Sequence, residues 1–264
     1  MTNPIETAPQ SLFQSERQRE IVALTLQDSR VEVADLADRF GVTTETIRRD
    51  LSDLQRQRVV RRVHGGAVPW EVSRFEPLLS VRSDQQDAEK RSIARLALDE
   101  LPPAGTVLVD SGSTLTRFGE ALTSELELRV LTNSLPTAQA LAENGSIEVV
   151  VIGGKVVKNT MAMVDAEAVA AVEAVTVDAL FISCDGLSPA NGLSTPYRDE
   201  AALKQAMIRS ARRVVVLADH SKFGHDHFKR FAEWSDVDVL ITDRGADQAM
   251  VTEIEARGTS VRVA

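Results

Sequence analysis

The chain has 264 residues, 43% hydrophobic and 26% charged, a balance that supports a packed core and excludes global disorder. Its formal net charge is −9, and the absence of any 18-residue apolar run predicts no membrane-spanning helix. Cys184 is the only cysteine, which excludes an intrachain disulfide; we expect a small buried hydrophobe and a reducing, cytoplasmic setting.

The chain begins with polar residues and then shows a helical pattern. Residues 1–15 carry no apolar signal region, so a flexible tail is expected there. Four apolar residues at i, i+3, i+4 and i+7 then predict one face of a helix: Val33, Leu36, Ala37 and Phe40. Gly41 follows them and permits a tight turn.

A second helix is predicted directly after this turn. The Thr43 hydroxyl can cap it, and Ile47, Leu51 and Leu54 form its apolar stripe. In a helix-turn-helix, the first residues of the second helix reach base edges in the major groove. Arginine can bond guanine in a bidentate manner, and threonine can contact the thymine methyl group. The candidate DNA-binding residues of this helix are Thr43, Thr44, Glu45, Thr46, Arg48 and Arg49.

A basic hairpin pattern, V-V-R-R-V-H-G-G-A-V, occupies residues 59–68. Its valines favour strands, and its two glycines permit a turn. Arg61, Arg62 and His64 would then face phosphates or the minor groove. Residues 46–64 carry a local charge of +4 in a chain of −9. Arginine-rich helices also occur as solvated surfaces, but the attached basic wing favours DNA binding.

A larger α/β domain is predicted over residues 86–264, after a linker at residues 69–85. Short apolar runs alternate with helical stretches, which predicts parallel strands with helical crossovers. The predicted strands cover residues 106–109, 128–131, 147–152, 179–182, 214–218, 239–241 and 260–263. The predicted helices cover residues 88–101, 115–122, 135–144, 166–175, 199–211 and 247–257. Residues 69–264 carry a net charge of −9, so this domain is expected to bind something other than nucleic acid.

Small polar residues follow five of the predicted strands, and ligands of open α/β sheets bind beyond these carboxyl ends. The S-G-S-T run at 111–114 opens a helix, where backbone N–H groups can face an anion. Asp110 and Asp185 suit sugar hydroxyls, because carboxylates accept hydrogen bonds. The candidate effector-binding residues are Asp110, Ser111, Gly112, Ser113, Thr114, Thr132, Asn133, Ser134, Gly153, Gly154, Lys155, Asp185, Lys204 and Lys222.

Each of these runs also has an ordinary explanation, because Asp-Ser-Gly forms turns and Gly-Gly ends strands. Because these runs all follow parallel strands, they converge at the carboxyl-end edge of the sheet, which we call the rim. This convergence predicts a polyol or sugar-phosphate site. His225, Asp226 and His227 offer three metal ligands, but no cysteine or distant motif supports them, so no metal is expected. Neither a Walker A nor a GxGxxG pattern is present, so no nucleotide cofactor is expected.

The motifs T-I-R-R-D-L-S-D-L and V-V-R-R-V-H-G-G-A-V resemble the DeoR family of bacterial transcriptional regulators. The resemblance continues through E-K-R-S-I-A-R-L-A-L, V-D-S-G-S-T, L-T-N-S-L, I-G-G, C-D-G and L-A-D-H-S-K-F-G, and it spans about residues 16–243. It implies a winged helix-turn-helix domain over residues 16–68, whose first helix covers residues 16–26. It also implies a C-terminal domain that resembles ribose-phosphate isomerase in fold and binds phosphorylated sugars.

The resemblance also places the effector along the rim. Carried over by motif, the effector-binding positions are residues 110–114 and 132–134 with Gly153, Asp185 and Lys222. Many members of the family carry glycine near the position of Asp165, so the loop over residues 155–165 departs from the usual pattern. This loop is therefore expected to influence the choice of ligand.

Two functions are considered. The first is a transcriptional repressor of sugar uptake or catabolism genes, which a phosphorylated sugar releases from its operator. It is expected to be a homodimer or homotetramer, and activation instead of repression is also considered. The second is a sugar-phosphate isomerase-like enzyme with a DNA-binding appendage, in which Asp110, Asp185 or Glu200 acts as base. No carboxylate pair stands at a defined spacing, so the regulator is favoured and no catalytic residue is assigned.

Overall fold

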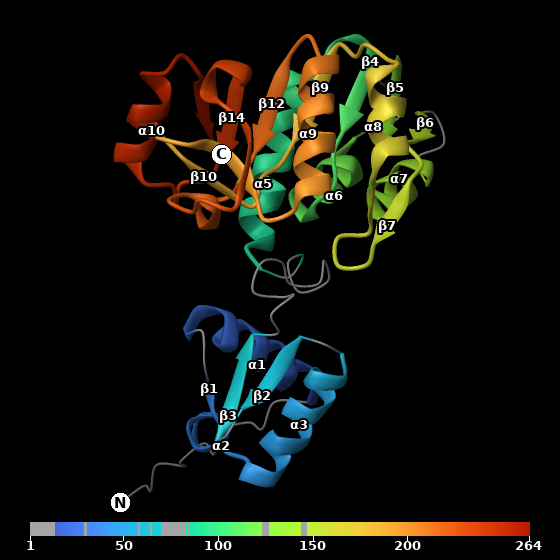
Figure 1. Ribbon diagram of the computed structural model, residues 1–264. Helices are drawn as coiled ribbons and strands as arrows, with labels where there is room; N and C mark the ends of the chain where they lie inside the picture. The colour runs from blue at the N-terminus through green and yellow to red at the C-terminus, as the bar shows by residue number, and fades with distance from the viewer. Residues whose placement is uncertain are drawn as a thin grey trace, which may run out of the picture. The chain divides into compact units, whose positions relative to one another are not determined.

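The computed structural model describes residues 14–28, 31–57, 59–63, 65–69, 83, 85–122, 127–143 and 147–264. The chain divides between residues 81 and 82 into two compact units, each with its own sheets and core (Figure 1). Most of the predicted linker, most of the predicted tail, Arg58 and His64 lie outside the described residues.

The N-terminal unit packs helices against a small antiparallel sheet. Its helices are α1 (Gln14–Asp28), α2 (Val33–Phe40) and α3 (Thr44–Arg56). Its strands are β1 (Val31–Glu32), β2 (Val60–Val63) and β3 (Gly66–Pro69), in the order β1-β3-β2. The helix α1 includes Gln14 and Ser15, which the sequence had placed in the tail, and Pro69 belongs to β3 rather than to the linker.

Local chemistry explains this helix-turn-helix. The α2 helix buries the four apolar residues that predicted it, and it ends at Gly41, which adopts a left-handed conformation with φ of 61°. The Thr43 side chain accepts from the Thr46 N–H at 3.2 Å and so caps α3. Gly66 lies against β1, where an added Cβ would sit 1.9 Å from the Val31 carbonyl oxygen, so only glycine fits.

The C-terminal unit is built on a seven-stranded parallel sheet in the order β15-β14-β12-β9-β4-β5-β6. Its strands are β4 (Ala104–Val109), β5 (Glu127–Thr132), β6 (Glu148–Val151), β9 (Ala179–Ile182), β12 (Val214–Leu217), β14 (Val239–Thr242) and β15 (Ser260–Val263). Its α-helices are α5 (Asp87–Ala97), α6 (Ser113–Ala121), α7 (Leu135–Ala142), α8 (Ala166–Glu173), α9 (Arg198–Ser210) and α10 (Gln248–Glu255). Every predicted strand and helix of this unit overlaps one of these elements.

Helices cover both faces of this sheet, as the ribbon view shows (Figure 1). One core packs α5, α6 and α7 against one face, and the other core packs α8, α9 and α10 against the opposite face. Alternation along β4 explains this, because Val107 and Val109 point into the first core and Leu108 into the second. The rings of Phe118 and Phe181 stack in the first core, with centroids 4.3 Å apart.

Two antiparallel additions were absent from the prediction. A hairpin joins β7 (Lys155–Val157) to β8 (Ala162–Val164). A second sheet has the order β10-β11-β13 and consists of Gly186–Ser188, Gly192–Thr195 and Lys229–Ala232. Within the part of the chain that the structure describes, no helix is long and apolar enough to cross a membrane.

Candidate functional site

The outer face of α3 is a polar, partly basic surface. Ile47, Leu51 and Leu54 point into the core and are at most 4% exposed. The opposite face therefore presents the predicted DNA-contacting residues Thr43, Thr44, Glu45, Arg48 and Arg49, all of which are exposed, while Thr46 is half-buried. Arg48 lies 3.5 Å from Glu45 in an exposed ion pair, which a phosphate or a base edge can replace at little cost.

The wing is held beside α3 by side-chain hydrogen bonds. The Arg62 backbone N–H donates to Gln55 at 3.2 Å, and the Arg62 guanidinium donates to the Ser52 hydroxyl at 2.9 Å. Arg61 and Arg62 are both exposed on β2. The wing and α3 therefore present their arginines from one connected surface, as binding to adjacent parts of a duplex requires. His64 lies outside the described residues.

A buried ion pair ties α3 to α1. The Arg17 Nε donates to Asp50 Oδ2 at 2.6 Å, and the two side chains are 9% and 1% exposed. Gln18 donates to the other Asp50 oxygen at 3.1 Å. Because Asp50 follows Arg48 and Arg49 directly, this pair constrains the orientation of the arginine-bearing helix. The sequence interpretation missed it, although a carboxylate in register with Ile47 and Leu54 was a visible signal.

In the C-terminal unit, the rim is formed by the carboxyl ends of the parallel strands, and the strand order reverses at β4. β4 pairs with β5 on one side and with β9 on the other, so crossovers leave these strands in opposite directions. Lys204 of α9 lies at this point: its ammonium contacts the Asp110 carboxylate and donates to the Ser183 carbonyl oxygen at 2.9 Å. Burial lowers the pKa of Lys204, but the adjacent carboxylates of Asp110 and Glu200 outweigh it and raise that pKa above its ordinary value.

The S-G-S-T run forms the start of α6. Gly112 has φ of 133°, and an added Cβ there would lie 2.9 Å from the Ser183 hydroxyl, so glycine allows the chain to pass close to β9. Gly112 also supplies no capping side chain, which leaves the first-turn N–H groups of α6 able to bind an external acceptor. Ser113 and Thr114 are 4% and 6% exposed.

The T-N-S run after β5 serves the fold as well as the rim. The Ser134 hydroxyl accepts from the Thr137 N–H at 3.3 Å and caps α7, and Thr132 accepts from the Ser134 N–H at 3.1 Å. The Asn133 amide donates to the Met163 carbonyl oxygen at 3.3 Å. Its Oδ1 atom is buried and has no hydrogen-bond partner among the described residues.

Gly153, Gly154 and Lys155 lie exposed where the chain enters β7. Directly after β8, at the same end of the hairpin as Lys155, Asp165 has φ of 152°, a conformation that favours glycine. Its carboxylate accepts from the N–H groups of Lys155 and Ala168, both at 2.9 Å. The bond from Ala168, followed by that from Lys155, lowers the pKa of Asp165 despite an opposing desolvation effect. An aspartate therefore joins the two ends of this loop through its carboxylate, at a position whose backbone conformation favours glycine.

Two buried charges at the rim, Lys90 and Asp219, were not among the candidate effector-binding residues. Lys90 of α5 is 4% exposed and donates to the Gln85 carbonyl oxygen at 2.6 Å. Burial raises the pKa of Asp219, but Lys222, a hydrogen bond from Ser221 and Lys90 outweigh it, so that pKa is lowered. Lys90 could have been found, because it shares the apolar register of Ile93, Ala94 and Ala97 on the buried face of α5.

Cys184 lies between these charged groups and is 3% exposed, as expected of a buried hydrophobe. Burial raises its pKa to about 12, an effect increased by Asp185 and Asp219 and opposed by Lys222 and Lys204. The predicted residues Asp185, Lys204 and Lys222 therefore all lie within electrostatic range of Cys184, whereas Lys155 belongs to the β7–β8 hairpin.

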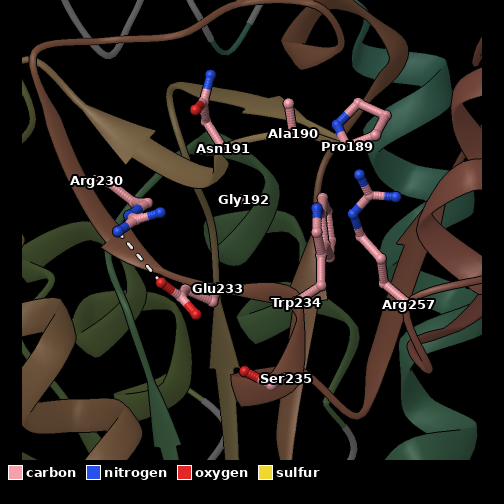
Figure 2. Close-up of a pocket in the computed structure, with 9 residues that line it drawn as sticks. All are labelled: Pro189, Ala190, Asn191, Gly192, Arg230, Glu233, Trp234, Ser235 and Arg257. Atoms are coloured by element: carbon pink, nitrogen blue, oxygen red, sulfur yellow. Dashed lines mark ion pairs between the residues drawn. The ribbon is translucent and has the colours of Figure 1, made fainter.

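Two hollows lie near these elements. One, of about 420 Å³, lies between the first turn of α5 and the loops after β12 and β14, where His220 Nδ1 is 2.8 Å from Asp243 Oδ2. The other, of about 330 Å³, borders the β10-β11-β13 sheet (Figure 2). Figure 2 shows Arg257 alongside Trp234, with Arg230 paired to Glu233 at 3.2 Å.

One of the three metal ligands considered from the sequence, Asp226, is held in other hydrogen bonds. Asp226 accepts from the Ser188 hydroxyl at 2.7 Å and from the Asn191 amide at 2.6 Å. Over the ranges that the structure describes, no group of three or more His, Cys, Asp or Glu residues is placed to hold a metal ion.

A winged helix-turn-helix followed by a doubly covered α/β unit with a charged rim defines a DNA-binding regulator with a sensor domain. Comparison with known families agrees. Residues 17–71 match the DeoR-like helix-turn-helix domain, and residues 85–244 match the DeoR C-terminal sensor domain. The chain belongs to the DeoR family, which confirms the resemblance seen in its motifs.

Relatives match over nearly the whole chain. The transcriptional regulator YulB of Bacillus subtilis is 34% identical over 94% of this chain and 95% of its own length. GlpR of Haloferax volcanii is also 34% identical, over 95% and 98%. The glycerol-3-phosphate regulon repressor of Escherichia coli is 29% identical over 87% and 91%.

A solved structure aligns more distantly. Ribose 5-phosphate isomerase A of Neisseria gonorrhoeae aligns over 53% of this chain and 54% of its own, with 21% identity and a TM-score of 0.40. Function follows from the sequence relatives instead, which are transcriptional regulators. The protein is therefore a DNA-binding transcriptional regulator, and the alternative of an isomerase-like enzyme is not favoured.

Proposed function

We propose that this protein is a cytoplasmic repressor that binds operator DNA and is released from it by a phosphorylated sugar. The observation that carries the proposal is the outer face of α3, where Thr44, Arg48 and Arg49 are exposed beside the wing. Relatives named as repressors support the direction of control, among them the glycerol-3-phosphate regulon repressor of E. coli and GlcR of B. subtilis.

The rim is the proposed effector site. A phosphate would bind the first-turn N–H groups of α6, while the Asp110–Lys204 pair and the free Asn133 oxygen would meet sugar hydroxyls. A ligand that carries both a phosphate and hydroxyls matches this combination of donors and acceptors. The name of the E. coli relative, which refers to glycerol 3-phosphate, is consistent with this class.

Release from DNA requires that the effector favour one arrangement of subunits over another. Helix-turn-helix proteins commonly bind two half-sites as dimers, so we infer a homodimer or homotetramer assembled through the C-terminal unit. Effector binding would then change the spacing of the two α3 helices relative to the half-sites.

The DNA-binding part of the proposal is tested with Arg48→Ala, measured by fluorescence anisotropy on the protein's own upstream DNA at fixed salt. The matched control is Arg209→Ala, which removes an equally exposed, ion-paired arginine from α9. Arg48→Ala should weaken operator binding and leave sugar-phosphate binding intact, while the control should change neither. Loss of both activities in a well-folded Arg48→Ala variant would count against the proposal.

The effector part is tested by calorimetric titration of a sugar-phosphate panel. Lys222→Ala removes a half-buried cation of the rim, and Lys158→Ala removes an exposed cation of the β7–β8 loop as control. Weaker binding by the first variant alone supports the rim site. Equal binding by both variants would place the ligand elsewhere.

A further inference from the structure

The outermost strand β6 forms one edge of the large sheet. Its sequence is Glu-Val-Val-Val, and among the described residues it pairs with β5 alone. Val150 and Val151 are 39% and 47% exposed, although they point to opposite faces of the sheet. Natural edge strands are usually blunted by lysine, proline or a bulge, because their free N–H and C=O groups invite another strand. The strand β6 has none of these within it.

Further apolar side chains extend this edge into a surface. Val151 is in register with Thr132, three residues before Leu135, and the Leu135 N–H donates to the Met161 carbonyl oxygen at 3.1 Å. Figure 1 shows β6, β7 and α7 at the same end of the sheet. The β6 surface is defined by five exposed apolar residues, Leu135, Val150, Val151, Val156 and Met161. They account for five of the seven large exposed apolar side chains in the described ranges.

The opposite edge of the sheet shows what a protected edge looks like in this fold. The strand β15 carries Arg262, whose guanidinium pairs with Asp99 at 2.8 Å and Glu100 at 2.6 Å. A charged, tethered side chain in the middle of a strand discourages pairing with a further strand. On the described part of this strand, Val263 is the only large apolar side chain that is exposed, and its exposed fraction is 43%.

Charge identifies the partner of the β6 surface. Glu148 stands exposed at the start of β6, where it forms an exposed ion pair with Arg129 of β5 at 2.9 Å, and Lys155 and Lys158 stand exposed beyond the end of β6. If two copies of β6 pair antiparallel about a two-fold axis, the Glu148 carboxylate of one strand faces the lysines of the other, which can extend or replace its weak exposed pair with Arg129. Such a surface is complementary to itself, as a two-fold interface requires.

We propose that the β6 surface is the interface with a second copy of this chain, formed by antiparallel pairing of the two β6 strands. The proposal deepens the proposed function, because reading two half-sites requires such a dimer. It also places the interface beside the effector rim: the Asn133 carbonyl accepts from the Met163 N–H at 2.7 Å, so the β7–β8 hairpin borders both.

The test is sedimentation velocity of the full chain without DNA, at micromolar concentration, for the wild type, Val150→Lys and Val263→Lys. The wild type and the β15 control should be dimers or tetramers. Val150→Lys should raise the dissociation constant of the dimer by about 10-fold or more, because it places two like charges near the axis. A monomeric wild type, or a Val150→Lys protein that assembles like the control, overturns the proposal.

A second variant guards against misfolding of Val150→Lys. Val150→Cys should form an intermolecular disulfide under mild oxidation, while Val263→Cys should not. Cys184 does not interfere, because it is 3% exposed and its pKa is raised to about 12. Equal cross-linking of the two variants contradicts the β6 interface. DNA half-site binding by a monomeric variant would leave the regulator function standing, so the two failures are distinguishable.

Discussion

Removing Arg17 should unfold the DNA-binding unit while sparing the sensor unit. Arg17→Met leaves the Asp50 carboxylate, 1% exposed, without its cation. Breaking a buried ion pair costs about 3–5 kcal/mol, because a charge is left desolvated. Small domains are stabilised by only about 5 kcal/mol or somewhat more, so this loss removes most of the margin of the N-terminal unit.

Removing both charges should restore the fold. Arg17→Met with Asp50→Leu exchanges a buried pair for apolar side chains, a change that is often neutral or stabilising. We therefore expect the double variant to unfold with a free energy within about 1 kcal/mol of the wild type, and a coupling energy of about 2 kcal/mol or more. Gln18, which donates to Asp50, is half-buried and can turn to solvent.

Hydrogen–deuterium exchange with mass spectrometry measures this locally. Peptides from α1 and α3 should lose protection in Arg17→Met and regain it in the double variant, while peptides from α9 serve as an internal reference. Unchanged protection of α3 in the single variant refutes the reasoning. So does a double variant as unprotected as the single one, since this would show that the pair itself holds the helix.

Further predictions concern DNA binding, local structure and pH. Arg48→Ala should weaken operator binding roughly 5- to 150-fold in anisotropy titrations, the range for one bidentate base contact. Thr43→Ala should cost about 1 kcal/mol in denaturant unfolding, through loss of the α3 cap. Gly66→Ala should yield an N-terminal unit without protected amides, because its Cβ meets the β1 backbone. The lowered pKa of Asp219 contributes stability that is present at neutral pH and is lost as pH falls through the folded value; Asp219→Asn should abolish this acid dependence in pH-dependent melting.

Periodicity predicted the regular elements well. The apolar residues of α2 recur at helical spacing, and Thr43 has the chemistry of a cap, so both were legible without the fold. The buried strands read as continuous apolar runs, as strands covered on both faces must. The start of α1 was harder to predict, because its first two residues, Gln14 and Ser15, are polar and exposed.

Short hairpin strands and long-range side-chain contacts could not be predicted from the sequence. The strands β7, β8 and β10 have only three residues each, too few for a period to show, and they pair across turns. The rim residues were predicted from their position after strands, but their partners were not. Lys204 meets Asp110 from 94 positions away, and Lys90 enters the rim from a helix that reads as ordinary and amphipathic.

Control of operator binding by a phosphorylated sugar can be measured directly. The measurement is fluorescence anisotropy of the protein on its own upstream DNA, titrated with a panel of sugar phosphates. The salt concentration is held constant, because contacts to DNA phosphates make the affinity steeply dependent on salt. We expect one sugar phosphate to release the DNA at micromolar concentration. Tight, specific DNA binding that no member of the panel changes would contradict this expectation.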